Sequence, residues 1–373
     1  MAGARSRYVC SECFADSALD GFAARHATRR TCDFCGASAP SVDLKKMVAH
    51  IGLCLRRVYE CEPADRHSST DALKTSELLK DIVRLELPRD SAGALSRAIC
   101  RGLGKVRWRE RNRTKRMKDA WRNFREILLW KRRFFLDGIL KDLRYATPEG
   151  FFQEIANTAE DRDLCVNLEK GTLLYRARWQ PSAALLRTPE QLGPPLPFQA
   201  IQANRMNPPG IPYFYASDSE NTALAEIGKS PGCYALARFE TSRPCRIVDL
   251  QRVRRPPSIF AEEAIRDYEA FDEIQDLNLL RWFAHAIAQP VPGDSLPHIE
   301  YVPTQVLSEF FRTYEFFEPP LEGIRFLSAQ DPTGSNLVLF VGQEALHGTA
   351  GHRTENRRGP WISLVDVKDV VIP

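Results

Sequence analysis

Four cysteines near the N-terminus have the spacing of a metal-binding site. Cys10 and Cys13 form one CxxC pair, and Cys32 and Cys35 form a second pair after an interval of eighteen residues. Two thiolates two residues apart can bind one Zn²⁺ from a tight turn, and two such pairs complete a tetrahedral site. Because four thiolates leave no open coordination position, we expect a zinc ion that stabilises the fold and takes no part in catalysis.

A pair of arginines in the second half of the chain has the chemistry of an anion site. In GTLLYRARW, Arg176 and Arg178 occupy alternate positions of a predicted strand, so both side chains lie on one face. Guanidinium groups match phosphate oxygens with two parallel hydrogen bonds, so such a pair in a pocket suits an anionic substrate. The alternative is a pair of exposed arginines on an edge strand.

A single carboxylate, Glu226, lies near the end of the stretch NRMNPPGIPYFYASDSENTALAEI, residues 204–227. The stretch opens with a proline-broken loop that contains Arg205 and Asn207, and it continues as an aromatic strand with Tyr213 and Tyr215. The order of loop, aromatic strand and small-residue helix predicts that the carboxylate faces a pocket. The alternative is an ordinary charged residue on a helix surface.

The helix that carries this carboxylate needs a cap. We expect Ser217 or Asp218 to be the N-cap, and the helix to begin over residues 222–227. Glu226 would then lie at the start of the helix.

Later elements place polar residues at the ends of predicted strands. EGIRFLSAQ predicts a strand that ends at Ser328, and SNLVLFVG predicts a core strand that Asn336 precedes. Between these and the carboxylate, YVPTQVLSEFFR predicts a helix in which Gln305 and Glu309 hold the fold. His285, in LRWFAHAIA, is expected to be packed and not catalytic.

Residues 43–160 are predicted to be mainly helical. LKKMVAHIGLCLRRVY, TSELLKDIVRLEL with Thr75 or Ser76 as its N-cap, and AWRNFREILLWKRRFFLDGILKDL have the apolar periodicity of three helices. Residues 101–133 contain fourteen Lys or Arg against three acidic residues. This run predicts either a solvated helix face or a phosphate-contacting patch for RNA or DNA. His50 is not preceded by an arginine at the spacing that some helical ribonucleases use, so we expect a core or interface histidine and no ribonuclease chemistry.

The composition is that of a soluble globular protein, with 43% apolar and 27% charged residues. Basic residues exceed acidic ones before residue 151 and acidic ones exceed basic ones after it, which favours separate tasks for the two parts. No apolar run approaches the ~20 residues that span a bilayer, and the N-terminus lacks a hydrophobic signal core, so we expect a cytoplasmic location and no membrane association. The remaining cysteines are expected to be reduced and buried: Cys54, Cys61, Cys100, Cys165, Cys233 and Cys245.

The motifs of the second half, taken in order, resemble those of the RES family. The matching stretches are LYRAR, NRMNPPGIPYFYAS with ALAE, YVPTQVLSEF, GIRFLSAQ and NLVLF. The paired cysteines followed by helices and by AWRNFREILLWKRRFF resemble the HEPN/RES N-terminal domain that is fused to such cores. The resemblance implies an α+β protein with a zinc-binding four-cysteine module over residues 1–42, a basic helical HEPN-like domain over 43–160 and a mixed α/β RES catalytic domain over 161–373. The last is expected to be similar to diphtheria-toxin-like ADP-ribosyltransferases.

The resemblance also implies the use of NAD as a substrate. Many RES proteins act as toxins that degrade NAD by phosphorolysis or hydrolysis, next to an antitoxin. The family's catalytic arginine, glutamate and serine fall on Arg176, Glu226 and Ser328, with Arg178 as the alternative arginine. The implied NAD-binding residues are Arg178, Arg205, Asn207, Tyr213, Tyr215 and Asn336. The chain has NRMN where the family often has GRWN, so a tyrosine would have to supply the aromatic face against which a base stacks.

The chemistry implied by this resemblance is cleavage of the bond between nicotinamide and C1 of its ribose. Arg176 and Arg205 would bind the pyrophosphate, and Glu226 would stabilise the positive charge that develops on the ribose. Ser328 and Asn336 would hold the ribose or an incoming phosphate. This reaction requires neither a nucleophile from the protein nor a metal ion.

Two other functions stay open from the sequence. One is an ADP-ribosyltransferase that modifies a macromolecule, and the other is a zinc-dependent nucleic-acid-binding protein with an inactive core. Expected partners are NAD and phosphate, an antitoxin or regulatory protein, nucleic acid at the basic segment, and a second copy of the chain.

Overall fold

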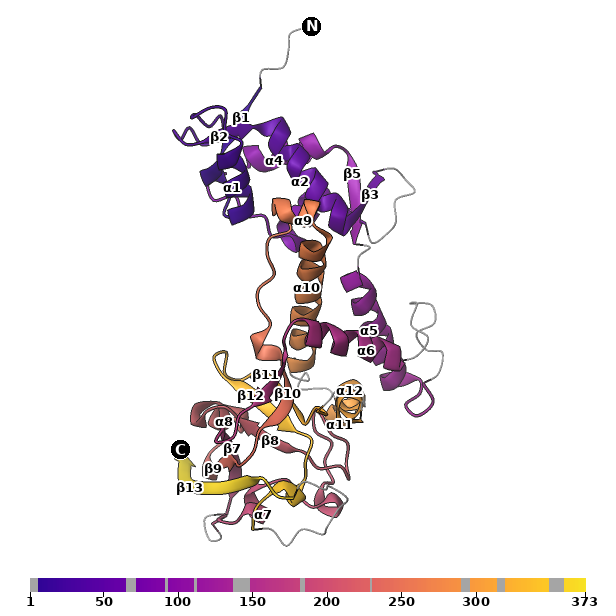
Figure 1. Ribbon diagram of the computed structural model, residues 1–373, viewed down its shortest axis with the longest axis vertical. Coiled ribbons are helices and arrows are strands. Elements are labelled where there is room, and N and C mark those ends of the chain that lie inside the picture. Colours follow the sequence, from indigo (N-terminus) through magenta and orange to yellow (C-terminus); the bar gives the residue numbers. More distant parts are fainter. Residues whose placement is uncertain are drawn as a thin grey trace. The chain divides into compact units, whose positions relative to one another are not determined.

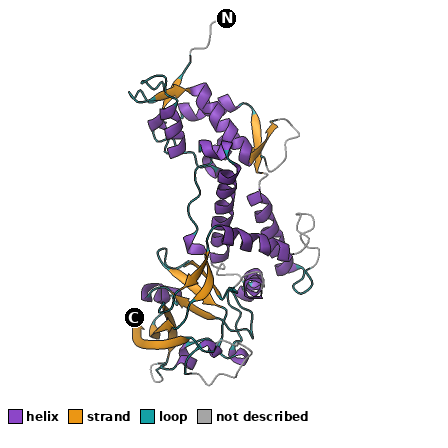
Figure 2. Cartoon of the chain, in the orientation of Figure 1, coloured by secondary structure: helices purple, strands orange, loops and turns teal. Residues whose placement is uncertain are grey.

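The computed structural model describes residues 6–64, 72–90, 93–110, 113–136, 148–181, 185–228, 230–289, 296–313, 319–348 and 359–373. The chain divides into two compact units. Unit 1 comprises residues 1–118 and 255–278, and unit 2 comprises residues 119–254 and 279–373. Both contain helices and sheet, so the fold is mixed α/β (Figure 2).

Unit 1 opens with a short cysteine-rich hairpin. Strand β1 (Tyr8–Cys10) pairs antiparallel with β2 (Ser41–Asp43), and a 3₁₀ turn, Ser11–Cys13, follows β1. Helix α1 (Ser17–Arg25) is capped by Asp16, whose carboxylate accepts hydrogen bonds from Ala18 N and Leu19 N. Asp43 caps α2 (Leu44–Val58) in the same way through Lys45 N. A hairpin, a turn and two capped helices thus surround the first pair of cysteines.

The described part of residues 43–160 is mainly helical, as predicted, but it also contains a three-stranded sheet that was not predicted. Strands β3 (Tyr59–Pro63), β5 (Val106–Glu110) and β4 (Leu73–Lys74) pair in that order, all antiparallel. Helix α4 (Ala94–Leu103) and the short α3 (Thr75–Glu77), which continues as a π-helix at Leu78–Ile82, complete this region (Figure 1). Lys74 is the N-cap of α3, where Thr75 or Ser76 was predicted.

The densest part of the basic run therefore lies partly on a strand and not on a helix face. Trp108 is buried, and its indole N–H donates to Thr75 Oγ1 at 2.9 Å. Its neighbours Arg107 and Arg109 alternate with it, and both have partners inside unit 1. Arg107 donates to the Ala72 carbonyl at 2.9 Å, and Arg109 pairs with Glu60 at 2.6 Å.

Residues 255–278 pack in unit 1 although they follow some 130 residues of unit 2. This segment contains α9 (Glu262–Arg266) and the first part of α10 (Tyr268–Ala288). Phe260 is buried in the same apolar core as Met47 and Ile51 of α2. His50 is buried too, as predicted for a core histidine, and its Nε2 lies 2.8 Å from the Phe260 carbonyl.

Two helices precede the main sheet. Helix α5 (Arg113–Trp130) ends earlier than predicted: residues 131–136 are not helical, and Phe134 and Phe135 are 90% and 85% exposed. The predicted continuation over residues 137–143 lies outside the described residues. In α6 (Pro148–Asp161), Phe151 and Phe152 pack against Phe124 of α5, with ring centroids 6.5 and 5.1 Å apart.

Unit 2 is built on an eight-stranded sheet with the order β13-β9-β7-β8-β12-β11-β10-β6 (Figure 1). Only β10 and β11 pair parallel; the other neighbours are antiparallel. Its strands are β6 (Cys165–Leu168), β7 (Leu173–Gln180), β8 (Phe214–Ser217), β9 (Gly232–Thr241), β10 (Cys245–Asp249), β11 (Gly323–Leu327), β12 (Ser335–Leu339) and β13 (Ile362–Ile372). The core between them is aromatic and aliphatic, and the rings of Phe214 and Phe239 meet edge to face at 5.1 Å.

Short helices connect these strands: α7 (Pro189–Leu192), α8 (Glu220–Glu226), α11 (Pro297–Glu300) and α12 (Val302–Thr313). Two predictions for α8 were wrong. Its N-cap is Ser219, whose hydroxyl accepts from Thr222 N, and Glu226 is its last residue instead of lying near its start. Among the described residues, no helix has both the length and the hydropathy needed to cross a membrane.

The remaining predictions for isolated residues had mixed outcomes. Gln305 is buried and holds the chain, as expected, because its Nε2 donates to the carbonyls of Asn204 and Asn207. His285 is not packed: it is exposed and shares a hydrogen bond with Gln289. Of the six further cysteines only Cys54 and Cys245 are buried; the other four are partly exposed.

Candidate active site

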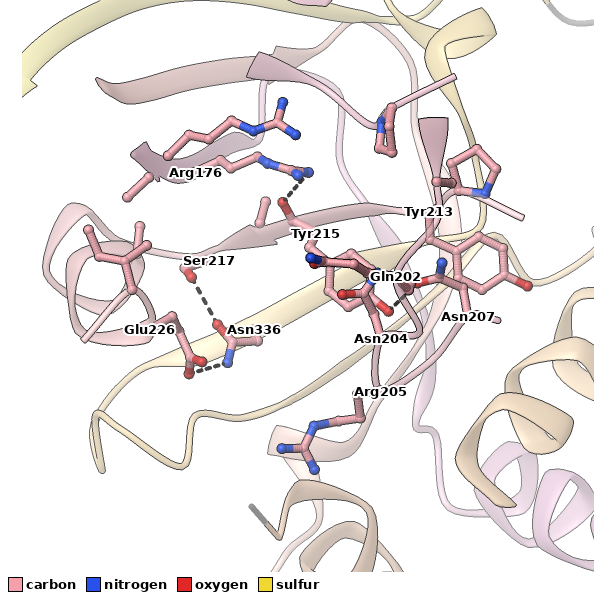
Figure 3. Close-up of a pocket in the computed structure, with 18 of the residues that line it drawn as sticks. Arg176, Gln202, Asn204, Arg205, Asn207, Tyr213, Tyr215, Ser217, Glu226 and Asn336 are labelled. Carbon is pink, nitrogen blue, oxygen red and sulfur yellow. Dashed lines mark hydrogen bonds between the residues drawn. The ribbon is translucent and has the colours of Figure 1, made fainter. Parts of the chain in front are cut away.

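A cavity of about 740 Å³ opens in unit 2 at the centre of the sheet. Its walls come from β7, β8, α8 and β12 and from the loop 195–213 (Figure 3). Eight of the nine predicted catalytic and NAD-binding residues line it: Arg176, Arg178, Arg205, Asn207, Tyr213, Tyr215, Glu226 and Asn336. The ninth, Ser328, is not among the lining residues but donates a hydrogen bond to Glu226, which is.

Glu226 lies on one wall and is held there by two donors. The hydroxyl of Ser328 donates to Glu226 Oε1 at 2.5 Å, and Asn336 Nδ2 donates to the same oxygen at 2.6 Å (Figure 3). Ser328 and Asn336 are more than a hundred residues away in sequence, so the sheet and not local structure brings the three together. The Glu226 residue as a whole remains exposed, which leaves its carboxylate accessible to a molecule in the cavity.

A network of hydroxyls and carboxylates fixes the helix that ends at Glu226. Thr222 donates to Asp331 Oδ2 at 2.7 Å, and Ser335 donates to Asp218 Oδ2 at 2.7 Å. These bonds tie both ends of the Asp218–Thr222 turn to the segment between β11 and β12. Gly334 permits the approach, because a Cβ there would lie 1.9 Å from Thr222 Oγ1.

The same segment also orients Ser328. Its Oγ accepts from Gln330 N at 3.1 Å and from Asp331 N at 3.0 Å. With both lone pairs occupied by backbone N–H groups, the hydroxyl proton is directed at the carboxylate of Glu226. Ser328 therefore acts here as a donor to Glu226.

Arg176 and Arg178 lie on the opposite side of the cavity, on neighbouring positions of one face of β7. Each guanidinium donates to backbone carbonyls only: Arg176 to Tyr215 at 3.2 Å, and Arg178 to Gln191 and Gly193. Among the described residues, neither has a carboxylate within ion-pair distance. Desolvation lowers the pKa of Arg176 to about 10, with the charge of Arg178 as a second cause, and desolvation also lowers the pKa of Arg178. Both groups stay charged at neutral pH, so the pair forms a partly desolvated cationic site without a counter-ion.

Tyr215 is hydrogen-bonded to the loop that carries NRMN, residues 204–207. Its side chain thus holds this loop and is not left free to stack against a base. Tyr215 donates its hydroxyl proton to Asn207 Oδ1 at 2.6 Å and accepts from Met206 N at 3.0 Å (Figure 3). Burial raises the pKa of Tyr215. Both side chains are thus largely occupied with each other and with the loop. Tyr213 is buried and packs against Phe340, with ring centroids 5.2 Å apart.

Arg205 has a structural partner as well. Its guanidinium donates to the carbonyls of Ile287 at 2.9 Å and of Gln289, at the C-terminal end of α10. A cation at this position satisfies carbonyls that have no partner within the helix. Arg205 is therefore committed to holding the fold through two carbonyls, as Arg178 is through those of Gln191 and Gly193.

Sequence reasoning missed several cavity residues. Four carboxamides line it besides the predicted ones, namely Gln199, Gln202, Asn204 and Gln330, and so does Ser217. Ser217 donates to Asn336 Oδ1 at 2.8 Å. Only the strand register, in which Ser217 lies opposite Asn336, could have suggested this contact, and no spacing within the sequence reveals it.

The four N-terminal cysteines come together in unit 1 as the spacing predicts. Their Sγ atoms all lie within 4.8 Å of one another, with Cys10–Cys13 at 3.6 Å, Cys10–Cys35 at 3.5 Å and Cys13–Cys32 at 3.7 Å. Sulfurs at the corners of a tetrahedron around Zn²⁺ are about 3.8 Å apart for a Zn–S bond of about 2.3 Å. The backbone N–H groups of Cys10 and Phe34 also donate to Cys32 Sγ, each at 3.4 Å, as expected for a thiolate ligand. The cluster fits a four-coordinate zinc ion.

Comparison with known families agrees with this arrangement. The RES domain model matches residues 173–356, and the model of HEPN/RES N-terminal domain 1 matches residues 25–142. The first match contains every residue of the cavity described above, and the two together cover most of the chain. No curated protein and no solved structure matches the chain. The chain belongs to the RES family, with a HEPN/RES N-terminal domain ahead of its RES domain.

Proposed function

We propose that this protein consumes NAD by cleaving the bond between nicotinamide and the C1 atom of its ribose. The observation that carries the proposal is the pairing of Glu226, anchored by Ser328 and Asn336, with the uncompensated cations Arg176 and Arg178 across one cavity. A carboxylate and a cation pair on facing walls match the two charged regions of the reacting dinucleotide. We further propose that the RES domain has an ADP-ribosyltransferase-like core.

The charges of the cavity match the electron flow of this reaction. When the C1–N bond breaks, its electron pair moves onto the pyridinium nitrogen, and neutral nicotinamide leaves. The ribose becomes oxocarbenium-like and positive, and the carboxylate of Glu226 stabilises it. Because Glu226 is fixed by hydrogen bonds before substrate binds, little reorganisation is needed as that charge develops.

Binding would rest mainly on Arg176 and Arg178. NAD carries a pyrophosphate with two negative charges, and a desolvated guanidinium pair without a carboxylate partner favours such an anion. Arg205, which holds the end of α10, has donors left for the same anion but less freedom to move. The carboxamides of Gln199, Gln202, Asn204 and Gln330 offer donors and acceptors to the base edges and ribose hydroxyls.

The acceptor that completes the reaction is phosphate or water. Attack by a phosphate oxygen on C1 yields ADP-ribose 1-phosphate, whereas attack by water yields ADP-ribose and releases one proton. In a cell such an activity would act as a toxin or defence effector, and we expect an antitoxin or regulatory protein to restrain it. The zinc ion at the four cysteines would stabilise unit 1 and take no part in the chemistry.

The test uses the purified full chain incubated with NAD, with and without phosphate, and identifies the products by mass spectrometry. ADP-ribose 1-phosphate that forms only with phosphate indicates phosphorolysis, and ADP-ribose indicates hydrolysis. A labelled macromolecule in a lysate would instead identify an ADP-ribosyltransferase. Intact NAD under every condition would refute the proposal. Growth arrest on expression, relieved by Glu226→Gln, tests the toxin role.

A further inference from the structure

Ser217 begins a directed chain of hydrogen bonds that ends at Glu226. Ser217 is the last residue of β8 and lies opposite Asn336 of β12 in the strand register. Its Oγ donates to Asn336 Oδ1 at 2.8 Å, and Asn336 Nδ2 donates to Glu226 Oε1 at 2.6 Å (Figure 3). Ser217 is buried, at 4% exposure, whereas Glu226 is open to solvent. The chain therefore runs from a fixed interior hydroxyl to an accessible carboxylate.

The direction of this chain is set at the carboxylate end of the carboxamide. An asparagine side chain can turn over, which exchanges its donor and acceptor ends. In the reversed orientation Oδ1 would face the carboxylate of Glu226 at about the distance of the present bond, and two acceptors would repel each other. The carboxylate of Glu226 can only accept, so it selects this orientation, and the hydroxyl of Ser217 then holds the carboxamide in place by donating to Oδ1.

The orientation decides which oxygen of Glu226 meets a substrate. Both donors described above, Ser328 and Asn336, reach Oε1. Among the described residues, no hydrogen bond reaches Oε2. One carboxylate oxygen is therefore used for anchoring, while the other keeps its lone pairs for a positive centre in the cavity. If Asn336 turned over, the anchor would weaken and the carboxylate could rotate.

We propose that Ser217 is a positioning residue for Glu226 that acts through Asn336. It touches no reacting atom; its hydrogen bond to Oδ1 holds in place the carboxamide that donates to the carboxylate. The inference rests on the proposed NAD cleavage for its kinetic consequences, but the hydrogen-bond chain itself can be tested without that reaction.

The kinetic test compares Ser217→Ala with Ser217→Thr. Removal of the hydroxyl should lower kcat for NAD loss about tenfold, the effect of weakening one hydrogen bond to a charged group, and leave KM within about twofold. Threonine keeps the hydroxyl and suits a strand, so it should restore kcat to within about threefold of the natural protein. Ser242→Ala is the matched control, since that hydroxyl donates to the Trp361 carbonyl between two strands of the same sheet, away from the cavity, and should leave kcat unchanged.

A double-mutant cycle separates positioning from a merely structural role. If Ser217 acts only through Asn336, the variant that combines Ser217→Ala with Asn336→Ala should be no slower than Asn336→Ala alone. Additive losses would overturn the proposal, and so would a Ser217→Ala variant with normal kcat. A tenfold loss that threonine does not rescue would count against it too, since the effect would then follow from packing.

A measurement without substrate keeps the inference separate from the proposed function. The two side-chain N–H signals of Asn336 can be assigned by NMR through their disappearance in Asn336→Ala. In Ser217→Ala they should shift and exchange faster with water, and in Ser217→Thr they should stay near their natural positions. Unchanged signals in Ser217→Ala would refute the chain even if the protein degrades NAD; shifted signals in a protein that leaves NAD intact would support the chain and refute the proposed function.

Discussion

Replacement of Glu226 by glutamine removes one negative charge and leaves the shape of the side chain almost unchanged. The glutamine oxygen can still accept from Ser328 and Asn336, which now lie 2.5 and 2.6 Å from Oε1, so the anchor need not be lost. The amide nitrogen would then take the position of Oε2 and present a donor, where a positive centre needs an anion. The variant therefore isolates the charge of Glu226 from its packing.

The expected decrease in kcat follows from the electrostatic role of Glu226. A preorganised group that faces developing charge lowers the activation free energy by ~3–4 kcal/mol. At 1.36 kcal/mol per tenfold change in rate, loss of this stabilisation in the variant corresponds to a decrease in kcat of about 10²–10³-fold. NAD binding should change little, because the anchoring arginines lie across the cavity and the substrate is anionic overall. KM should thus stay within about threefold while kcat falls.

The assay is loss of NAD over time at saturating substrate, with nicotinamide release as a second readout. Glu220→Gln is the matched control: it is the same substitution in the same helix, but Glu220 pairs with Lys368 outside the cavity and should be kinetically silent. Thermal unfolding of both variants should stay close to that of the natural protein. A Glu226→Gln variant that keeps kcat within about threefold would refute the electrostatic role assigned to this carboxylate.

Three further predictions concern binding, metal and pH. Arg176→Gln should raise the Kd for ADP-ribose, measured by calorimetry, more than tenfold, because it removes a desolvated cation without a counter-ion. The control Arg187→Gln breaks a half-exposed ion pair with Asp369 and should leave this Kd unchanged. Equal affinity for ADP-ribose in both variants would place the anion site elsewhere. Elemental analysis should find one zinc ion per chain. The variant Cys32→Ser should lose this zinc, and the control Cys100→Ser should retain it. A Cys32→Ser variant that keeps its zinc would exclude the four-cysteine site. Burial lowers the pKa of His50 below the usual 6.5, so the unfolded chain binds the proton more readily; the stability from neutral His50 is present above pH ~6.5 and is lost as the pH falls below it. The Tm measured from pH 7.5 down to 5.5 should therefore fall less steeply in His50→Gln, and identical slopes would rule out this contribution.

The residues that meet at the cavity could be named from the sequence because each belongs to a motif with its own local order. Arg176 and Arg178 alternate on a strand, and period 2 alone puts them on one face. Ser328 and Asn336 are each more than a hundred residues from Glu226, and only the order of motifs across the RES family brought the three into one set. Ser217 was missed because its role comes from register: it lies opposite Asn336 through pairing of β8 with β12, which no local pattern encodes.

The errors in unit 1 have a different physical origin. In VRWRE, residues 106–110, arginines alternate with Val106 and Trp108. This alternation is the period-2 pattern of a strand. The segment was instead interpreted as an exposed helix face because its density of cations is high. Within that strand Arg109 pairs with Glu60. In unit 2, the cap of α8 was misplaced because Ser217, Asp218 and Ser219 are all good caps, and only the hydrogen bond from Thr222 N selects the last.

The return of residues 255–278 to unit 1 has a practical consequence for dissecting this protein. The chain passes between the units three times, after residues 118, 254 and 278. A protease cut at one of these passages would leave the units covalently joined through the other two. A RES domain prepared by deleting residues 1–118 would keep Phe260 and Phe271 without the α2 core that buries them, and it would be expected to aggregate. To isolate the catalytic unit, residues 255–278 would also have to be replaced by a polar linker. Expression of the RES domain without unit 1 therefore needs two deletions, residues 1–118 and residues 255–278.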